Sequence, residues 1–399
     1  MTLTPDYAAS LADDIYQIKT AATRKGFIFK YKGDMELVGD GPVEKGSKPK
    51  KMLPGVAVSG ATGAFGLLKS THTMGVTSFG KSPKYANEAF VLLKGTASLF
   101  DGLTDANAGL KRFHSGGLVH QGFFYTFDSF LPQLQEFAQE CASRGISTIH
   151  CVGHSLGGAL ATLVADWLRV NVKTSEVELY TFGSPRVGMP FFAEGCCAKV
   201  GPSNIYRVFH NLDPVPMVPT WPFSHVTDSF DDYRMACNMA QNPVKYHSIK
   251  TYVKTVEKAG GQWSVLKSHN EPEILEASVI SWLESDGPVS FSLNSAKVLN
   301  AALLWIINKI SEVFFVGLVG VGGTAFTLLD RLAYMMHKAY EFGEKVGYWV
   351  DRLMKKMAKM LGFIITETTN FTYSFIRSLF LRMFHHVNEL TRRASKTIF

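Results

Sequence analysis

The sequence predicts an α/β protein with a mostly parallel central sheet, followed by a C-terminal helical region that is both apolar and basic. Short runs rich in β-branched and aromatic residues alternate with longer runs at helical spacing, which predicts β-α-β units covered on both faces. The 399 residues are 46% hydrophobic and 19% charged, so a core of ordinary size is available. This composition excludes a disordered or collagen-like chain.

Two breaks in composition divide the chain into three parts. A polar stretch at 39–51 precedes a Gly-rich region, and Pro, Gly and Ser cluster at 285–296. We therefore expect an N-terminal helix and extended segment that packs on the core (1–54), an α/β domain (55–286) and a helical tail (287–399).

The elements of the α/β domain follow from periodicity. Strands are predicted where β-branched or aromatic residues run together, at 88–94, 147–152, 177–183 and 204–210. Helices are predicted where apolar residues recur at helical spacing or where Ala and Leu dominate, at 118–144 and 156–170.

The cysteines and the first residues bear on the compartment. Five cysteines contain no C-x-x-C pair, which excludes a zinc ribbon and a thioredoxin-type site, and their odd number fits a reduced chain. The first twenty residues lack a basic start followed by an apolar core. We therefore expect no Sec signal peptide, and we expect the chain to be made in the cytoplasm.

A candidate nucleophile lies between a predicted strand and a predicted helix. The run HCVGHSLGG contains G-x-S-x-G as Gly153, Ser155 and Gly157, in the context that a nucleophile elbow requires. The glycines let strand and helix meet in a tight turn, and the amides at the helix start point at developing negative charge. The alternative is a Gly-rich turn with a capping serine. Phosphate binding is disfavoured, because neither a P-loop nor G-x-G-x-x-G is present.

A serine nucleophile needs a base, and the base needs an orienting carboxylate. Asp213 follows the predicted strand at 204–210, and prolines at 214, 216 and 219 stiffen the loop that carries it. The alternative is an aspartate that only starts a turn. Three further aspartates are interpreted as solvated loop residues: Asp228, Asp231 and Asp232.

Five segments, in this order, resemble the class 3 lipases, the fungal-lipase-type α/β-hydrolases: KGTASLFDGLTDANAG, VHQGF, GHSLGGALA, YTFGSPRVG and RVFHNLDPVPMVP. The resemblance covers about residues 85–255. It implies an α/β-hydrolase fold, hydrolysis of carboxylic esters of lipids by a Ser-His-Asp triad, and no metal or cofactor for that chemistry. It places the triad acid at Asp213.

The base has two candidates. His247, in KYHSIKTYV, resembles the family segment that delivers the base at the start of a helix, although the match is approximate. His269, in KSHNEP, lies at a spacing from Asp213 closer to that of the fungal members. We favour His247. Three histidines are not expected to be the base: His154, which should pack at the elbow, His210, which is too close to Asp213, and His225.

The resemblance also implies an oxyanion hole and a cover. Two backbone amides, those of Leu156 and Thr96, would receive the negative charge, and Thr96 would add its hydroxyl. The family has Arg where this chain has Lys94, and Trp where it has Gly102. Residues 98–117 are expected to form an apolar lid, with an ordinary loop as the alternative.

The net charge is concentrated in the tail. Residues 1–286 hold 27 basic and 27 acidic side chains, so the excess of +7 falls in 287–399. A tail that is basic and apolar indicates a lipid surface rather than nucleic acid. Residues 313–329 carry no charge but are at the short limit for a membrane span. Residues 332–364 predict an amphipathic helix with a basic flank, and 371–384 repeat this character.

Together these observations predict an enzyme that cleaves acyl esters of membrane glycerophospholipids, a phospholipase A or lipase, because a basic tail suits anionic head groups. The chain resembles bacterial effector lipases exported by contact-dependent secretion, such as type VI. Export to a membrane would then involve a secretion adaptor or an immunity protein as partners. The alternative function is a membrane-inserting or partner-binding protein that uses the hydrolase fold as a scaffold. For the tail, the alternative to membrane contact is a helical domain packed on the hydrolase or on a partner.

Overall fold

The structure is a computed structural model. It describes residues 2–17, 55–62, 70–80, 83–95, 109–219, 223–226, 232–237, 243–258, 260–267, 276–287, 289–313, 328–342, 345–366 and 369–395.

The centre of the molecule is a sheet to which the described residues contribute seven strands, in the order β1-β2-β3-β6-β7-β8-β9. From β3 onward the neighbouring strands are parallel, while β1 and β2 run antiparallel at one edge. The strands are β1 (Gly55–Thr62), β2 (Ser70–Phe79), β3 (Glu88–Leu93), β6 (Thr148–His154), β7 (Glu176–Phe182), β8 (Ile205–His210) and β9 (Tyr233–Met235). The predicted mostly parallel sheet is confirmed.

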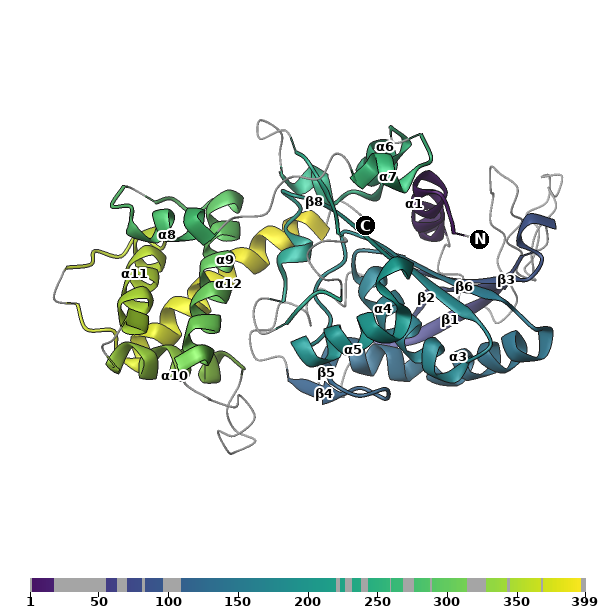
Figure 1. The fold of residues 1–399 in the computed structure, drawn as a ribbon, viewed down its shortest axis with the longest axis horizontal. Coiled ribbons are helices and arrows are strands. Elements are labelled where there is room, and N and C mark those ends of the chain that lie inside the picture. Colours follow the sequence, from purple (N-terminus) through teal and green to yellow (C-terminus); the bar gives the residue numbers. More distant parts are fainter. Residues whose placement is uncertain are drawn as a thin grey trace.

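Helices cover both faces of this sheet (Figure 1). One face packs against α3 (Gln121–Arg144), α4 (Leu156–Asn171) and α5 (Pro190–Val200), and the other against α1 (Pro5–Asp14) and α6 (Ile249–Glu257). The buried strand β3 serves both cores, because Val91 belongs to the first cluster and Phe90 and Leu92 to the second. This two-sided burial explains why β3 is a continuous apolar run from Ala89 to Leu93.

Two predictions about the α/β elements need correction. The helix expected over 118–144 begins only at Gln121, because residues 118–120 form strand β5 (Leu118–His120), which pairs with β4 (Leu110–Arg112). The Gly-rich stretch at 55–80 was not predicted as strands, yet it forms β1 and β2. Its Gly, Ser and Thr residues have no apolar alternation that would have shown this.

The tail is a helical bundle with a hydrophobic core of its own, to the left in Figure 1. It consists of α8 (Glu276–Glu284), α9 (Leu293–Val313), α10 (Leu328–Glu341), α11 (Lys345–Met360) and α12 (Tyr373–Ser395). The one amphipathic helix expected over 332–364 is wrong in extent, because it is divided into α10 and α11. The apolar faces of these two helices are buried in the bundle rather than exposed.

Among the described residues, no helix combines the length and apolarity needed to cross a bilayer. The uncharged stretch at 313–329 lies, from 314 to 327, outside the described residues.

Helix α12 belongs to both parts of the molecule. Ile376 and Phe380 are buried in the bundle core, whereas Val387 joins the first core of the α/β part. In the last turns, Leu390 packs beside Leu212 and Tyr246, and the buried Thr391 hydroxyl lies 3.5 Å from the carbonyl of Pro214. Figure 1 shows α12, in yellow, running from the bundle to the α/β part near β8.

Candidate active site

Ser155 lies at the turn between β6 and α4 in a backbone conformation that is rare for a residue with a side chain. Its φ is 58° and its ψ is −133°, and such strain is found at functional sites. The flanking glycines make the turn possible. A Cβ at Gly153 would lie 2.3 Å from the carbonyl oxygen of Gly157, and one at Gly157 would lie 2.2 Å from that of Leu93. A serine on this turn of a mostly parallel sheet is the arrangement of the predicted α/β-hydrolase fold.

The structure brings Ser155, His247 and Asp213 together. His247 Nε2 lies 2.9 Å from Ser155 Oγ, and His247 Nδ1 lies 2.8 Å from Asp213 Oδ2. His247 is the last residue of the 3₁₀ helix η5 (Pro243–His247), which directly precedes α6. Asp213 lies in the turn that follows β8. This pattern fits an imidazole that donates from Nδ1 to the carboxylate and accepts at Nε2 from the serine hydroxyl, so the hydroxyl proton has a base within reach. His269 lies outside the described residues.

Asp213 is buried and accepts three hydrogen bonds. Its Oδ1 accepts from the backbone N–H of Val215 at 2.9 Å, and its Oδ2 accepts from the hydroxyl of Tyr252 at 2.7 Å as well as from His247. Burial and the nearby Asp213 carboxylate raise the pKa of Tyr252 well above its usual value, so Tyr252 stays a donor. Because η5 ends at His247 and α6, which follows it, carries Tyr252, two consecutive elements fix the imidazole and the carboxylate.

A second histidine, His154, is hydrogen-bonded to the backbone of His247. His154 Nε2 lies 2.8 Å from the carbonyl of His247, and its Nδ1 lies 2.9 Å from the hydroxyl of Tyr16. Burial, followed by the proximity of His247, lowers the pKa of His154 well below its usual value, so its ring is neutral. Its packing role at the elbow agrees with the expectation from the sequence.

Tyr16 is a site residue that the sequence did not reveal. It lies in the 3₁₀ helix η1 (Ile15–Gln17), and its hydroxyl also accepts from the backbone N–H of Gly95 at 3.4 Å. Tyr16 therefore connects the N-terminal helix to the elbow and to the end of β3. Nothing in its local sequence indicates this, because His154 and Gly95 are distant from it in the chain.

The predicted oxyanion hole is described only in part. The backbone N–H of Leu156 is in the first turn of α4, where it has no partner within the helix. The end of β3 lies beside it, since a Cβ at Gly95 would be 3.3 Å from the Leu156 nitrogen. Thr96 lies outside the described residues, as do residues 98–108 of the expected lid. In the remainder of that segment, Phe113 is buried between α3 and α5.

The other candidate residues have structural contacts. His210 bonds the Thr255 hydroxyl at 2.8 Å and the Tyr246 carbonyl at 3.0 Å, and His225 bonds the Pro216 carbonyl at 2.9 Å. The interpretation of Asp232 as a solvated residue is wrong. It is buried and forms an ion pair with Arg207, because this arginine is itself buried and needs a counter-charge. Asp228 and Asp231 lie outside the described residues.

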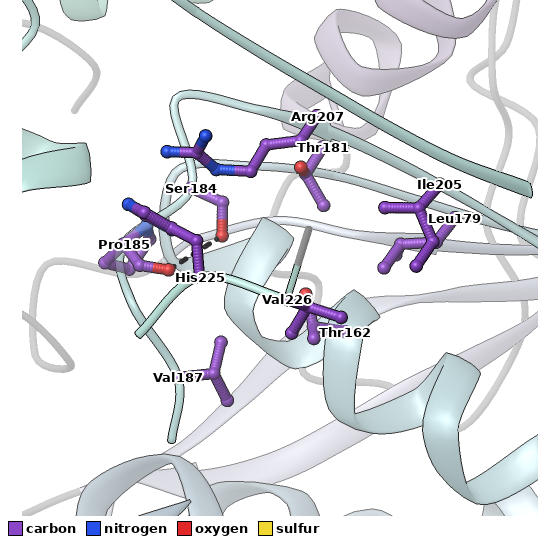
Figure 2. A pocket seen from close by; sticks show the side chains of 10 residues that line it. All are labelled: Thr162, Leu179, Thr181, Ser184, Pro185, Val187, Ile205, Arg207, His225 and Val226. Carbon is purple, nitrogen blue, oxygen red and sulfur yellow. Dashed lines mark hydrogen bonds between the residues drawn. The ribbon is translucent and has the colours of Figure 1, made fainter. Parts of the chain in front are cut away.

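A small cavity lies between α4 and the parallel strands (Figure 2). Its volume is about 10 Å³, roughly the space that one water molecule needs. Ser184 and His225 lie on one side of it and Thr162 and Val226 on another. This volume is too small for an acyl chain. Within the part of the chain that the structure describes, no group of three His, Cys, Asp or Glu residues is placed to hold a metal ion.

Buried neutral histidines predict a stability that falls in acid. Burial lowers the pKa of His120 and of His210 to about 4, and it lowers that of His154 well below its usual value. Below a pH of about 6.5 these histidines bind protons in the unfolded chain but stay neutral in the folded chain. The free energy of unfolding therefore falls as the pH is lowered. Each histidine contributes about 1.4 kcal/mol per pH unit between pH 6.5 and 4. Urea unfolding at pH 7.5 and pH 5.5 measures this loss.

Asp13 and Asp14 act in the opposite direction, because burial raises the pKa of both, that of Asp14 to about 6. Burial also lowers the pKa of His225 well below its usual value, so four histidines act against these two groups. His385 is exposed, so His385→Gln is expected to leave the pH dependence unchanged. A free energy of unfolding that is equal at the two pH values would contradict the expectation.

Comparison with known proteins places residues 90–223 in the family model described as Lipase (class 3). Secreted mono- and diacylglycerol lipase 1 of Fusarium solani is 34% identical over 155 residues, which are 38% of this chain and 45% of that protein. Toxin TseL of Vibrio cholerae is 36% identical over 118 residues, 29% of this chain and 17% of the toxin. The chain therefore spans less than half the length of these two relatives.

A solved structure, the triacylglyceride lipase of Rhizomucor miehei, is 23% identical with a TM-score of 0.36, over 45% of this chain and 67% of that chain. The residues that match the family model include Ser155 and Asp213 but end before His247.

Proposed function

We propose that this protein, whose residues 90–223 match the family model described as Lipase (class 3), is a serine hydrolase that cleaves carboxylic esters of lipids. One observation carries the proposal: Ser155, on a strained turn, is hydrogen-bonded to an imidazole that a buried carboxylate holds. A capping serine would not need such partners.

In the proposed mechanism, Ser155 Oγ attacks the ester carbonyl carbon while His247 Nε2 takes the hydroxyl proton. The oxyanion that forms is stabilised by the N–H of Leu156 and, by resemblance, by Thr96. When the tetrahedral intermediate collapses, the bond to the alcohol oxygen breaks, and His247 returns its proton to that oxygen. Water then attacks the acyl-serine by the same steps, which releases the fatty acid and restores the serine. Asp213 holds His247 in the required tautomer throughout.

Burial of the site bears on how a lipid reaches it. The side chains of Ser155 and His247 are 0% exposed, so part of the surrounding chain must move before an ester carbonyl can approach. This requirement suits an enzyme whose active site is covered in water and becomes accessible at a lipid surface. The lid over 98–117 remains a prediction.

The substrate class is proposed from the relatives and the tail. Acylglycerols are favoured by the relatives named as mono- and diacylglycerol lipases. We infer membrane glycerophospholipids as the finer substrate, with phospholipase A activity, because the excess positive charge of the tail suits anionic head groups. The domain limits at 55–286 and 287–399 are part of this proposal, although α8 (Glu276–Glu284), which lies before the second limit, packs in the helical bundle. We propose that the helical part brings the hydrolase to a membrane.

The likeness to a named toxin supports the proposal of an exported antibacterial effector. Such an effector would need a secretion adaptor for export and an immunity protein to protect the producing cell. The competing proposal, a protein that inserts or binds while its hydrolase fold is inert, predicts no fatty-acid release.

A fluorophosphonate tests the proposed function, because it forms a covalent adduct only with a serine that a base activates. Incubation with mixed diacylglycerol and phospholipid vesicles is expected to release fatty acids, measured by mass spectrometry. After fluorophosphonate treatment the release should stop, and the adduct should be found on the peptide that carries Ser155. An adduct on another residue, or release that survives labelling of Ser155, contradicts the proposal.

A further inference from the structure

A polar cavity lies at the end of α8 beside α11. Figure 1 labels these two helices in the bundle. Its volume is about 280 Å³. It is lined mainly by charged and polar side chains and is far larger than the cavity beside α4. The lining residues are Leu283, Ser285, Asp286, Arg352, Lys355, Lys356, Lys359, Ile365 and Thr366.

The lining is strongly unbalanced in charge. It contains four cations from α11 and one carboxylate, that of Asp286. Asp286 is itself largely exposed and lies 3.6 Å from the guanidinium of Arg352. Lys355 pairs with Asp351 at 2.8 Å, and Lys359 is exposed on the same helix. The cavity therefore carries a positive field that its own carboxylate does not neutralise.

Lys356 makes this imbalance costly, because its side chain is only 3% exposed. Its ammonium donates to the carbonyl and, at 2.7 Å, to the hydroxyl of Ser285, and it lies 5.4 Å from the ring centre of Trp282. These contacts are all with neutral groups. Burial, and next the charges of Lys359 and Arg352, lower the pKa of Lys356. The charge of the nearby Asp286 carboxylate acts on the pKa of Lys356 in the opposite direction. A buried ammonium near like charges is stabilised when an anion occupies the space between them.

The rim of the cavity adds an apolar feature. The chain that follows α11 contributes Ile365 and Thr366 to the lining, and the neighbouring Ile364 is 96% exposed. A fully exposed isoleucine beside a cationic cavity is unfavourable in water but suits a bilayer surface. There the isoleucine can enter the acyl region while the cations meet phosphates.

We infer that the cavity formed by α11 and residues 283–286 binds the phosphate of an anionic phospholipid at a membrane surface, with Ile364 inserted beside it. The recognised chemistry is a phosphate oxyanion, which Arg and Lys side chains bind through charge-assisted hydrogen bonds. The exposed isoleucine favours a lipid over free phosphate. The inference deepens the proposed function, because it names the part of the tail that would hold the hydrolase to its substrate surface.

The test measures binding of the full chain to vesicles by sedimentation, in a Ser155→Ala background so that lipid is not consumed. Vesicles of phosphatidylcholine are compared with vesicles that also contain phosphatidylglycerol. Tight binding is expected only to the second. Lys355→Gln combined with Lys359→Gln is expected to weaken that binding about thirtyfold, and Ile364→Ser is expected to weaken it further.

A matched control removes two charges elsewhere in the tail. Lys338 and Lys345 are exposed and do not line the cavity. Lys338→Gln with Lys345→Gln is expected to change binding less than threefold, and Lys355→Arg with Lys359→Arg is expected to retain it. Equal losses in the two Gln pairs would mean diffuse attraction by the whole tail and would overturn the site. A thermal melt of each variant shows that it is folded.

Two further outcomes separate the possible sources of phosphate and the two proposals. In the first outcome, inorganic phosphate stabilises the parent chain but not the Lys355/Lys359 double variant, and the parent chain does not bind vesicles. This outcome would assign the cavity to a soluble phosphate and overturn the lipid claim. Hydrolysis of a soluble short-chain ester by the chain with an intact Ser155 tests the catalytic proposal separately. Vesicle binding can thus fail while the esterase persists, or the reverse.

Discussion

Replacing Ser155 with alanine is expected to lower kcat for fatty-acid release by a factor of at least about a thousand. The substitution removes the only atom that the proposed mechanism uses to form the acyl-enzyme. His247 and Asp213 keep their hydrogen bond, so binding of the lipid is expected to change little. The measurement is fatty-acid release from phosphatidylglycerol vesicles, followed by mass spectrometry, with wild type and variant at equal concentration.

Ser175→Ala is the matched control. Ser175 is also a buried serine, but its hydroxyl bonds the carbonyl of Ile146 at 2.6 Å and lies at the start of β7 rather than at the elbow. Its loss is expected to cost about 1 kcal/mol of stability and to leave kcat unchanged. If Ser155→Ala kept more than a tenth of the wild-type rate, the chain would not be a serine hydrolase acting through Ser155.

Replacing Asp213 with asparagine is expected to reduce kcat by about 10⁴-fold. The side chain keeps its size, but an amide NH₂ cannot accept from both Tyr252 and His247 as the carboxylate Oδ2 does. With a donor opposite Nδ1, the imidazole would carry its proton on Nε2, and it could not accept from Ser155. The rate constant for hydrolysis of a soluble short-chain ester measures the loss without a lipid interface.

Tyr252→Phe serves as the comparison for this variant. It removes one donor to Asp213 and one acceptor for the N–H of His210 but leaves the carboxylate in place. A loss of about tenfold in kcat is expected, together with a lower stability. A wild-type rate in Asp213→Asn would remove Asp213 from the mechanism, whatever the result for Tyr252.

The parts of the fold that the sequence predicted well are those with local signals. Strand β3 contains a continuous apolar run because both faces of the sheet are covered, and β6, β7 and β8 are rich in β-branched or aromatic residues. Helix α4 follows directly from the elbow motif. The edge strands β1 and β9 were missed. The first is rich in Gly, Ser and Thr, and the second has only three residues, so neither carries a usable period.

The site shows the same division between local and distant signals. Ser155 and Asp213 stand in motifs that can be read from neighbouring residues, whereas the choice of His247 rested on an approximate match. The contacts of Tyr16 with His154 and Gly95 join segments that are far apart in the chain. Only the folded arrangement reveals such contacts, because no local pattern encodes them.

The tail shows the limit of reading amphipathicity alone. The stripe of apolar residues on α10 and α11 was compatible with a membrane surface and with a packed bundle. In the structure the two helices bury this stripe against each other and against α12. The membrane proposal therefore depends on the basic edge of α11 and the exposed Ile364 rather than on the apolar stripe.

Because the last turns of α12 rest against Leu212 and the Pro214 carbonyl, the bundle and the hydrolase are mechanically joined at the turn that carries Asp213. If the bundle moves when it binds the proposed membrane surface, either the contact of Thr391 with Pro214 breaks or the turn that carries Asp213 moves with the bundle. A chain truncated before α12 would lose this contact, and Leu212 and Tyr246 would no longer pack against Leu390. The proposed membrane attachment and the position of the Asp213 carboxylate would thus both depend on α12.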